Sequence, residues 1–216
     1  MHVAFDTTLD PTIRAPGHLR ELFSPSAAIP GDVNEAQLLA RARAGDEPAF
    51  AELFGLHQRP IYRYAAHMCG ADAADDIVQD TFMALLTHNR TFDAARGPLG
   101  AYLFGIARHL MLKRLGSRYN TPTDDLETVN THVAPDLSAL DVLSRQETVA
   151  AVRSAIAELP PVFREAIVLC DLQEMDYQSA AMVLECPLGT VRSRLHRARA
   201  LLANRLSMLR PVKQMS

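Results

Sequence analysis

The chain has 216 residues, of which 48% are hydrophobic and 22% charged, and its formal net charge is −3. This length leaves room for two small domains, and the net charge by itself argues against nucleic-acid binding. No stretch reaches the roughly 18 uncharged apolar residues of a membrane span, and the N-terminus lacks the apolar core of a signal peptide. We therefore expect no membrane insertion and a place in the cytoplasm.

The charge is segregated along the sequence. Residues 190–216 hold seven Lys or Arg and no acid, whereas residues 121–147 hold six acids against Arg145 alone. A local basic element can bind phosphates whatever the total charge, so nucleic-acid binding stays open.

The first part of the chain changes from a proline-containing tail to periodic helices. Residues 1–33 hold four prolines without a sustained period, and we expect them to be disordered. Helical periodicity begins at the candidate N-cap Asn34 and runs to residue 118, with helices starting near Pro48 and covering about 71–88 and 99–116. The inward positions expected in the helix at 71–88 are Ile77, Val78, Thr81, Phe82, Leu85 and Leu86.

Residues 119–143 are acidic and lack a period, which predicts a flexible linker. A second domain, 144–209, is expected to begin at Ser144, which forms a capping-box pattern with Glu147. The first helix of this domain should end at Leu159. Further helices should cover about 162–171, 176–184 and 190–209. The predicted fold class is all-α, with two small helical domains.

The sharpest motif, at residues 176–199, predicts a helix, a short turn and a second helix. Thr190 is the expected N-cap of the second helix, and Val191, Leu195, Ala198 and Leu202 should face the core. The residues left to project outward are Arg192, Ser193, His196, Arg197 and Arg199. Such side chains at a helix start suit base edges and phosphates in a major groove, although an ordinary solvated basic face is the alternative.

Residues 159–169 together with 187–199 closely resemble region 4 of sigma factors of the extracytoplasmic-function (ECF) group of the sigma-70 family. The resemblance implies that this domain reads the −35 promoter element. The implied −35 contacts are Thr190, Arg192, Ser193, Arg194, His196 and Arg197. One departure is Glu185, which replaces a frequent glycine; a left-handed backbone there would cost on the order of 1 kcal/mol.

Residues 75–86 look like the family's region 2 helix, which docks on the β′ clamp of RNA polymerase. The implied polymerase contacts are Asp76, Gln79, Asp80 and Met83, although the same four residues would also suit an ordinary helix surface.

Residues 101–115 resemble the segment that reads and melts the −10 element. Melting calls for cations on the backbone and aromatic rings that stack on bases. The cations are Arg108, His109, Lys113 and Arg114, and the aromatics are Phe104 and Tyr102, the latter equally compatible with a core position. In the loop 89–98, which takes the family's position for selecting a flipped base, the candidates are Phe92, Asp93 and Arg96.

The resemblance implies a sigma factor with three partners: core RNA polymerase (β′ clamp and β flap), promoter DNA and an anti-sigma factor. A stand-alone helix-turn-helix regulator is the alternative. We expect neither an enzyme nor a metal or cofactor, since the histidines and acids form no metal or triad pattern. Cys69, Cys170 and Cys186 lack the paired spacing of metal or redox sites and are expected to be buried thiols, with a redox or metal sensor as the alternative.

Overall fold

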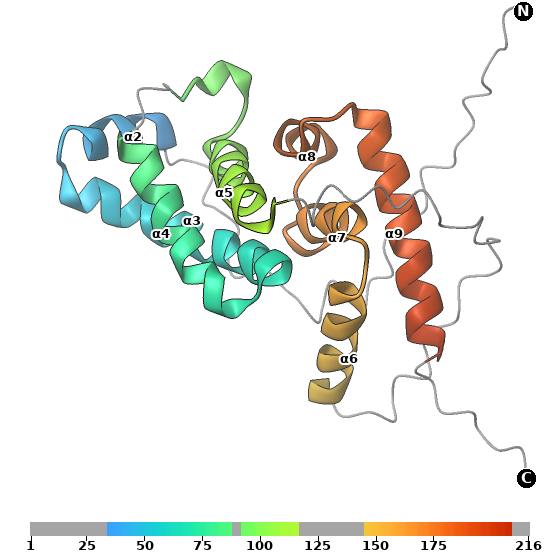
Figure 1. The fold of residues 1–216 in the computed structure, drawn as a ribbon. Coiled ribbons are helices and arrows are strands. Elements are labelled where there is room, and N and C mark those ends of the chain that lie inside the picture. The colour runs from blue at the N-terminus through green and yellow to red at the C-terminus, as the bar shows by residue number, and fades with distance from the viewer. Residues whose placement is uncertain (1–33, 88–91, 117–144, 209–216) are drawn as a thin grey trace, which may run out of the picture.

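A computed structural model of the chain describes residues 34–87, 92–116 and 145–208, and every regular element in these ranges is helical. The elements form two packed units that lie side by side (Figure 1). The first unit contains α2 (Glu35–Arg43), α3 (Glu47–Cys69), α4 (Ala71–Thr87), the 3₁₀ turn η1 (Ala94–Arg96) and α5 (Leu99–Leu115). The second contains α6 (Arg145–Ala157), α7 (Pro161–Ile167), the π-helical turn η4 (Val168–Leu172), α8 (Tyr177–Leu184) and α9 (Leu188–Met208).

The prediction of an all-α fold with two small helical domains is confirmed. The expected tail, linker and Ser144 cap lie outside the described residues. None of the described helices combines the length and apolar character that a membrane crossing requires.

Side-chain caps fix where several helices begin. The carboxamide of Asn34 accepts the N–H of Gln37 at 3.1 Å, and Asp46 caps α3 by accepting the N–H of Ala49 at 3.2 Å. Pro48 follows in the first turn of α3, where its missing N–H leaves no bond unmade. The predicted starts at Asn34 and near Pro48 are therefore confirmed.

The core of the first unit lies where α3 packs against α4 and α5. The expected inward residues of α4 are buried, apart from Leu86, which is half-buried. Phe104 was expected to offer a ring for stacking on bases, but it is only 6% exposed and packs edge-on against Tyr64, with ring centroids 5.3 Å apart. The sequence period could not show that Phe104 is buried, because α5 is apolar on most of its circumference and no single buried face stands out.

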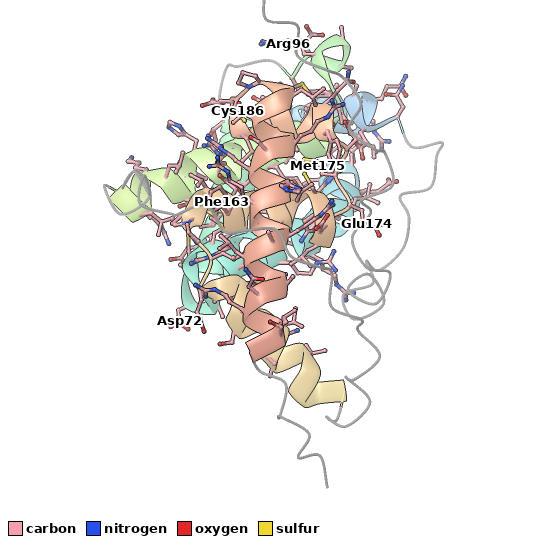
Figure 2. All side chains as sticks on the ribbon, turned by 90° about the vertical axis from the view of Figure 1, so that its right-hand side faces the viewer. Asp72, Arg96, Phe163, Glu174, Met175 and Cys186 are labelled. Atoms are coloured by element: carbon pink, nitrogen blue, oxygen red, sulfur yellow. The ribbon has the colours of Figure 1, made fainter. Side chains whose placement is uncertain are left out.

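The second unit is built around α9, which packs on α6, α7 and α8 and crosses the face shown in Figure 2. The four positions expected to face the core, Val191, Leu195, Ala198 and Leu202, are all buried, which confirms the period. The helix begins two residues earlier than predicted, because the Pro187 carbonyl accepts the N–H groups of Thr190 at 2.9 Å and Val191 at 3.2 Å. Thr190 is therefore not the N-cap and lies inside the first turn.

Two acidic residues on either side of α8 have left-handed backbones: Glu174 with φ 54° and Glu185 with φ 51°. L residues with a Cβ atom are strained there, whereas glycine is not. The backbone cost anticipated for Glu185 is thus present in the structure.

We expect Glu174→Gly to raise the free energy of unfolding by about 1 kcal/mol relative to Glu174→Ala. Both variants remove the same side-chain contacts, but only glycine relieves the left-handed backbone. Urea unfolding of the two variants measures the difference, and equal midpoints would show that the backbone at this turn is not strained.

Candidate nucleic-acid and polymerase interfaces

The helix-turn-helix is formed by α8, a turn at residues 185–187 and α9. Asp176 caps α8 by accepting the N–H groups of Gln178 and Ser179, both at 2.9 Å. The Ser179 hydroxyl also donates to the Asp176 carboxylate at 2.6 Å. This bond, together with the two backbone bonds, holds the pKa of the Asp176 carboxyl below its usual range. The cap stays ionised at neutral pH and keeps the first helix of the motif in place.

Four side chains of the first turns of α9 are exposed together. They are Arg192, Ser193, His196 and Arg197. The hydroxyl of Ser193 donates to the carbonyl of Thr190 at 3.0 Å. Three nitrogen-bearing side chains therefore point to solvent from one helix face, whose opposite face is buried.

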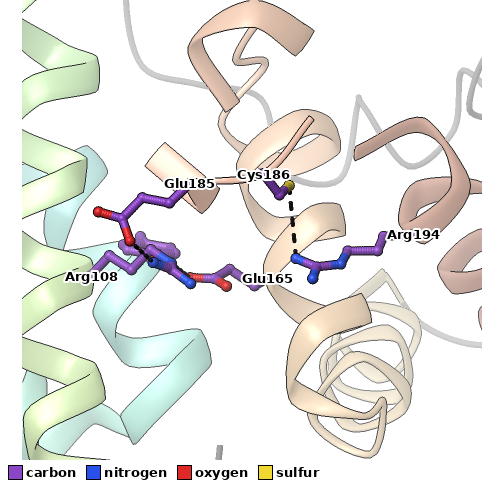
Figure 3. A network of polar contacts seen from close by, with 6 residues as sticks. Arg108, Glu165, Glu185, Cys186 and Arg194 are labelled. Atoms are coloured by element: carbon purple, nitrogen blue, oxygen red, sulfur yellow. Dashed lines mark hydrogen bonds and ion pairs between the residues drawn. The ribbon is translucent and has the colours of Figure 1, made fainter. Parts of the chain in front are cut away.

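Two other arginines of α9 do not share this direction. Arg199 was expected to point outward. Instead it donates two hydrogen bonds to the carboxylate of Asp171 in η4, one of 2.7 Å from Nη2 and one of 3.0 Å from Nε. Those bonds raise the pKa of Arg199. Arg194, one of the expected −35 contacts, is half-buried and places Nη1 3.9 Å from Sγ of Cys186 (Figure 3).

The outer face of α4 carries the four expected polymerase contacts. Asp76, Gln79, Asp80 and Met83 are all exposed, and Met83 is 54% exposed, an unusual position for a large apolar side chain. Beside this face lies a groove of about 590 Å³ between α3 and α4. Among its lining residues are Phe50, Phe54, Tyr62, Gln79, Phe82 and Met83. The sequence did not predict this groove, because α3 and α4 contribute to it from separate segments.

The exposed part of α5 connects two of the expected surfaces. His109 and Lys113 are exposed, whereas Arg114 pairs with Asp76 through two contacts of 3.2 Å and lies 3.8 Å from Asp80. A cation expected to hold −10 DNA thus lies against two acids expected to bind polymerase.

The loop before α5 is partly described. Phe92 is half-buried against Tyr102, with ring centroids 5.7 Å apart. Asp93 and Arg96 are exposed, and the Asp93 carboxylate accepts the N–H of Ala95 at 3.0 Å. Residues 89–91 of the expected loop lie outside the described residues.

Arg108 is the expected −10 cation that the structure places differently from the other cations. Its side chain is only 11% exposed and reaches from α5 to the second unit. There, Nε lies 3.1 Å from Glu165 of α7, and Nη1 lies 3.5 Å from Glu185 in the turn of the helix-turn-helix (Figure 3).

Glu165 is a functional candidate that sequence reasoning missed. Its side chain has no exposed surface, and the Tyr64 hydroxyl donates to it at 2.6 Å. Burial raises the pKa of Glu165, while Arg108 and the Tyr64 bond oppose that rise. Its sequence signal was the position of an acid directly before the apolar run 166–169, where a buried carboxylate needs a partner from elsewhere in the fold.

The three cysteines are free and half-buried, not fully buried as expected. Burial raises the pKa of Cys69, and burial, followed by the charge of Asp171, raises the pKa of Cys170 to about 12. Thiols so disposed are poor nucleophiles at neutral pH. In the described ranges, no group of three or more His, Cys, Asp or Glu side chains is arranged to hold a metal ion.

Comparisons with known proteins match both units. The family model described as Sigma-70 region 2 matches residues 53–121, and the one described as Sigma-70, region 4 matches residues 150–202. The ECF RNA polymerase sigma factor SigM of Mycobacterium tuberculosis is 35% identical over 195 residues, which cover 87% of this chain and 93% of SigM. SigW of Bacillus subtilis, also an ECF sigma factor, is 27% identical over 177 residues, or 78% of this chain and 94% of SigW.

Two solved structures resemble the fold. CnrH in complex with the cytosolic domain of CnrY has a TM-score of 0.60 at 28% identity, covering 82% of this chain and 99% of CnrH. RpoE in complex with the anti-sigma factor NepR, from Bartonella quintana, has a TM-score of 0.53 at 28% identity, covering 74% of this chain and 98% of RpoE.

Asp171→Asn should lower the free energy of unfolding by about 1–3 kcal/mol, because it weakens a two-bond ion pair whose carboxylate is only 9% exposed. Glu158→Gln is the matched change at an exposed pair, Glu158 with Arg205, and should cost less than about 1 kcal/mol. Chemical denaturation compares them. Equal losses would show that the Asp171 pair does not anchor α9.

Proposed function

Because this chain belongs to the ECF group of sigma-70 RNA polymerase sigma factors, we propose how its described surfaces divide the work of transcription initiation. The family membership makes it a sigma factor and not the stand-alone regulator considered from the sequence. We assign residues 34–118 to region 2, 119–143 to the linker and 144–209 to region 4.

The first surface is the exposed face of α9, which we assign to the −35 element. The observation that carries this assignment is the exposure of Arg192, His196 and Arg197 on a helix whose opposite face is buried. Arginine side chains can bond a guanine edge with two hydrogen bonds, and the helix start favours a phosphate. Arg194 is assigned a supporting position behind the turn, since its guanidinium faces Cys186.

The second surface is the outer face of α4 with the adjoining groove, which we assign to core polymerase at the β′ clamp. An exposed methionine beside acids and an amide, next to an aromatic groove, has the mixed character of a protein interface. The β flap is assigned to region 4 by family resemblance.

The third surface comprises the exposed residues of α5 and its preceding loop, assigned to the −10 element. His109, Lys113 and Arg114 supply cations, while Phe92 and Tyr102 form a ring pair at its edge. Aromatic rings and cations are the groups that single-stranded DNA requires.

The remaining partners follow from the family and its relatives. RpoE was solved with an anti-sigma factor, and we propose that this chain is likewise held by one until released. Because its partners are polymerase and DNA, we place it in the cytoplasm. We infer that it acts by binding, without catalytic chemistry of its own, as sigma factors generally do.

Arg197→Ala should reduce transcription directed by the chain about 10- to 100-fold, and the salt slope of promoter binding should fall by about one if the contact is to phosphate. The measurement is run-off transcription from a genomic fragment library with core polymerase. Arg205→Ala, on the same helix but paired with Glu158, is the control and should leave transcription close to wild type. Equal losses in both variants would remove the −35 assignment.

Gln79→Ala combined with Asp80→Ala should weaken binding to core polymerase at least tenfold, because it removes two exposed polar contacts from the assigned face. Asp72→Ala, exposed in the first turn of the same helix, is the control. Competition against a labelled sigma factor for core enzyme gives the affinities. Unchanged binding of the double variant would contradict the assignment of α4.

A further inference from the structure

The two surfaces assigned to promoter DNA differ in their exposure to solvent when the units are packed together. The −35 face of α9 is exposed along its first turns. Arg108 of the −10 surface, in contrast, is turned into the second unit and nearly buried there. We propose that Glu165 and Glu185 form an acidic clasp that takes the place of DNA phosphate on Arg108 and holds the two units closed. This inference rests on the proposed assignment of α5 to the −10 element.

The inner half of the clasp is Glu165. Its carboxylate is fully buried on α7, yet two groups that satisfy it, the Tyr64 hydroxyl at 2.6 Å and Arg108 Nε at 3.1 Å, come from the first unit. A buried carboxylate without such partners is strongly unfavourable. The charge of Arg194, on α9 of the second unit, also acts on Glu165, but the hydrogen bonds from Tyr64 and Arg108 both come from the first unit. The clasp therefore makes these two bonds to Glu165 depend on contact between the units.

The outer half of the clasp is Glu185. Its side chain is 81% exposed, and its Oε2 lies 3.5 Å from Nη1 of Arg108. Arg108 is thus held between two carboxylates, one buried and one in solvent, as Figure 3 shows. Carboxylate oxygens on a guanidinium occupy the positions that phosphate oxygens would take. Duplex or single-stranded DNA can reach Arg108 only after the carboxylates leave it.

A second contact supports the same closure independently. The loop that precedes α5 lies directly against α8, since a Cβ atom at Gly97 would come within 2.7 Å of Cε of Met182. Further along the junction, Nη2 of Arg63 lies 3.4 Å from the Gln173 side chain. The second unit therefore covers part of the assigned −10 loop as well as Arg108.

The test uses the full chain without polymerase. Glu165→Gln keeps the size of the side chain and its bond to Tyr64, but it removes the negative charge that faces Arg108. We expect an increase in the radius of gyration by small-angle X-ray scattering, and an affinity for a random-sequence single-stranded DNA oligonucleotide that rises at least fivefold. Glu158→Gln is the control, since it makes the same charge change at a pair within the second unit, and it should change neither quantity.

A second pair of variants covers the case in which Glu165→Gln fails to fold, which circular dichroism detects. Glu185→Gly and Glu174→Gly both relieve a left-handed backbone, and Glu185 is the acid whose carboxylate lies 3.5 Å from Arg108. Glu185→Gly should expand the chain and raise DNA affinity about two- to fivefold, and Glu174→Gly should do neither.

The outcomes separate the clasp from the −10 assignment. An unchanged radius of gyration in Glu165→Gln and Glu185→Gly overturns the clasp. Expansion without tighter DNA binding retains the clasp as a contact between the units and overturns the role of Arg108 on −10 DNA. Expansion of the control variants to the same extent overturns the clasp too, since closure would then depend on general charge.

Discussion

A fully buried carboxylate constrains how the two halves of this chain sit together. Glu165 has no contact with solvent and is bonded by Tyr64 from α3 and Arg108 from α5. Because a buried carboxylate that loses hydrogen-bond donors is destabilised, separation of α3 and α5 from α7 is opposed at this point. The two recognition units of this sigma factor are thereby held against each other partly through polar contacts, and such contacts can be exchanged for water when the units part.

Periodicity predicted the parts of the fold that depend on local sequence. The buried stripe of α9, the inward residues of α4 and the cap at Asn34 all follow from side-chain spacing and helix-start chemistry. Apart from the start of α9, the main errors concern side chains whose direction depends on distant partners. Arg199 turns toward Asp171, which is 28 residues away, and Arg108 turns toward Glu165, 57 residues away. The spacing of residues along one helix carries no information on such partners. The sequence therefore does not distinguish arginines that are exposed to solvent from arginines that pair with a distant acid.

The surfaces assigned to polymerase and to the −10 element are electrostatically connected. Arg114 on α5 lies against Asp76 and Asp80 on α4, and all three side chains are well exposed. An exposed pair of this kind is weak and easily exchanged. A partner that engages the two acids therefore alters the surroundings of a cation assigned to DNA, and the two binding events are not independent at this position.

The position of α8 between two left-handed residues has a consequence for local stability. Only eight residues long, α8 is too short to be stable by its own backbone hydrogen bonds, so its order depends on its neighbours. Those neighbours are α9 and η4 within its own unit and α5 across the junction. A helix that is unstable by itself thus makes part of the contact between the units. Separating the units removes some of the packing that keeps α8 folded. Slow amide exchange in α8 would therefore report on the closed arrangement as a whole.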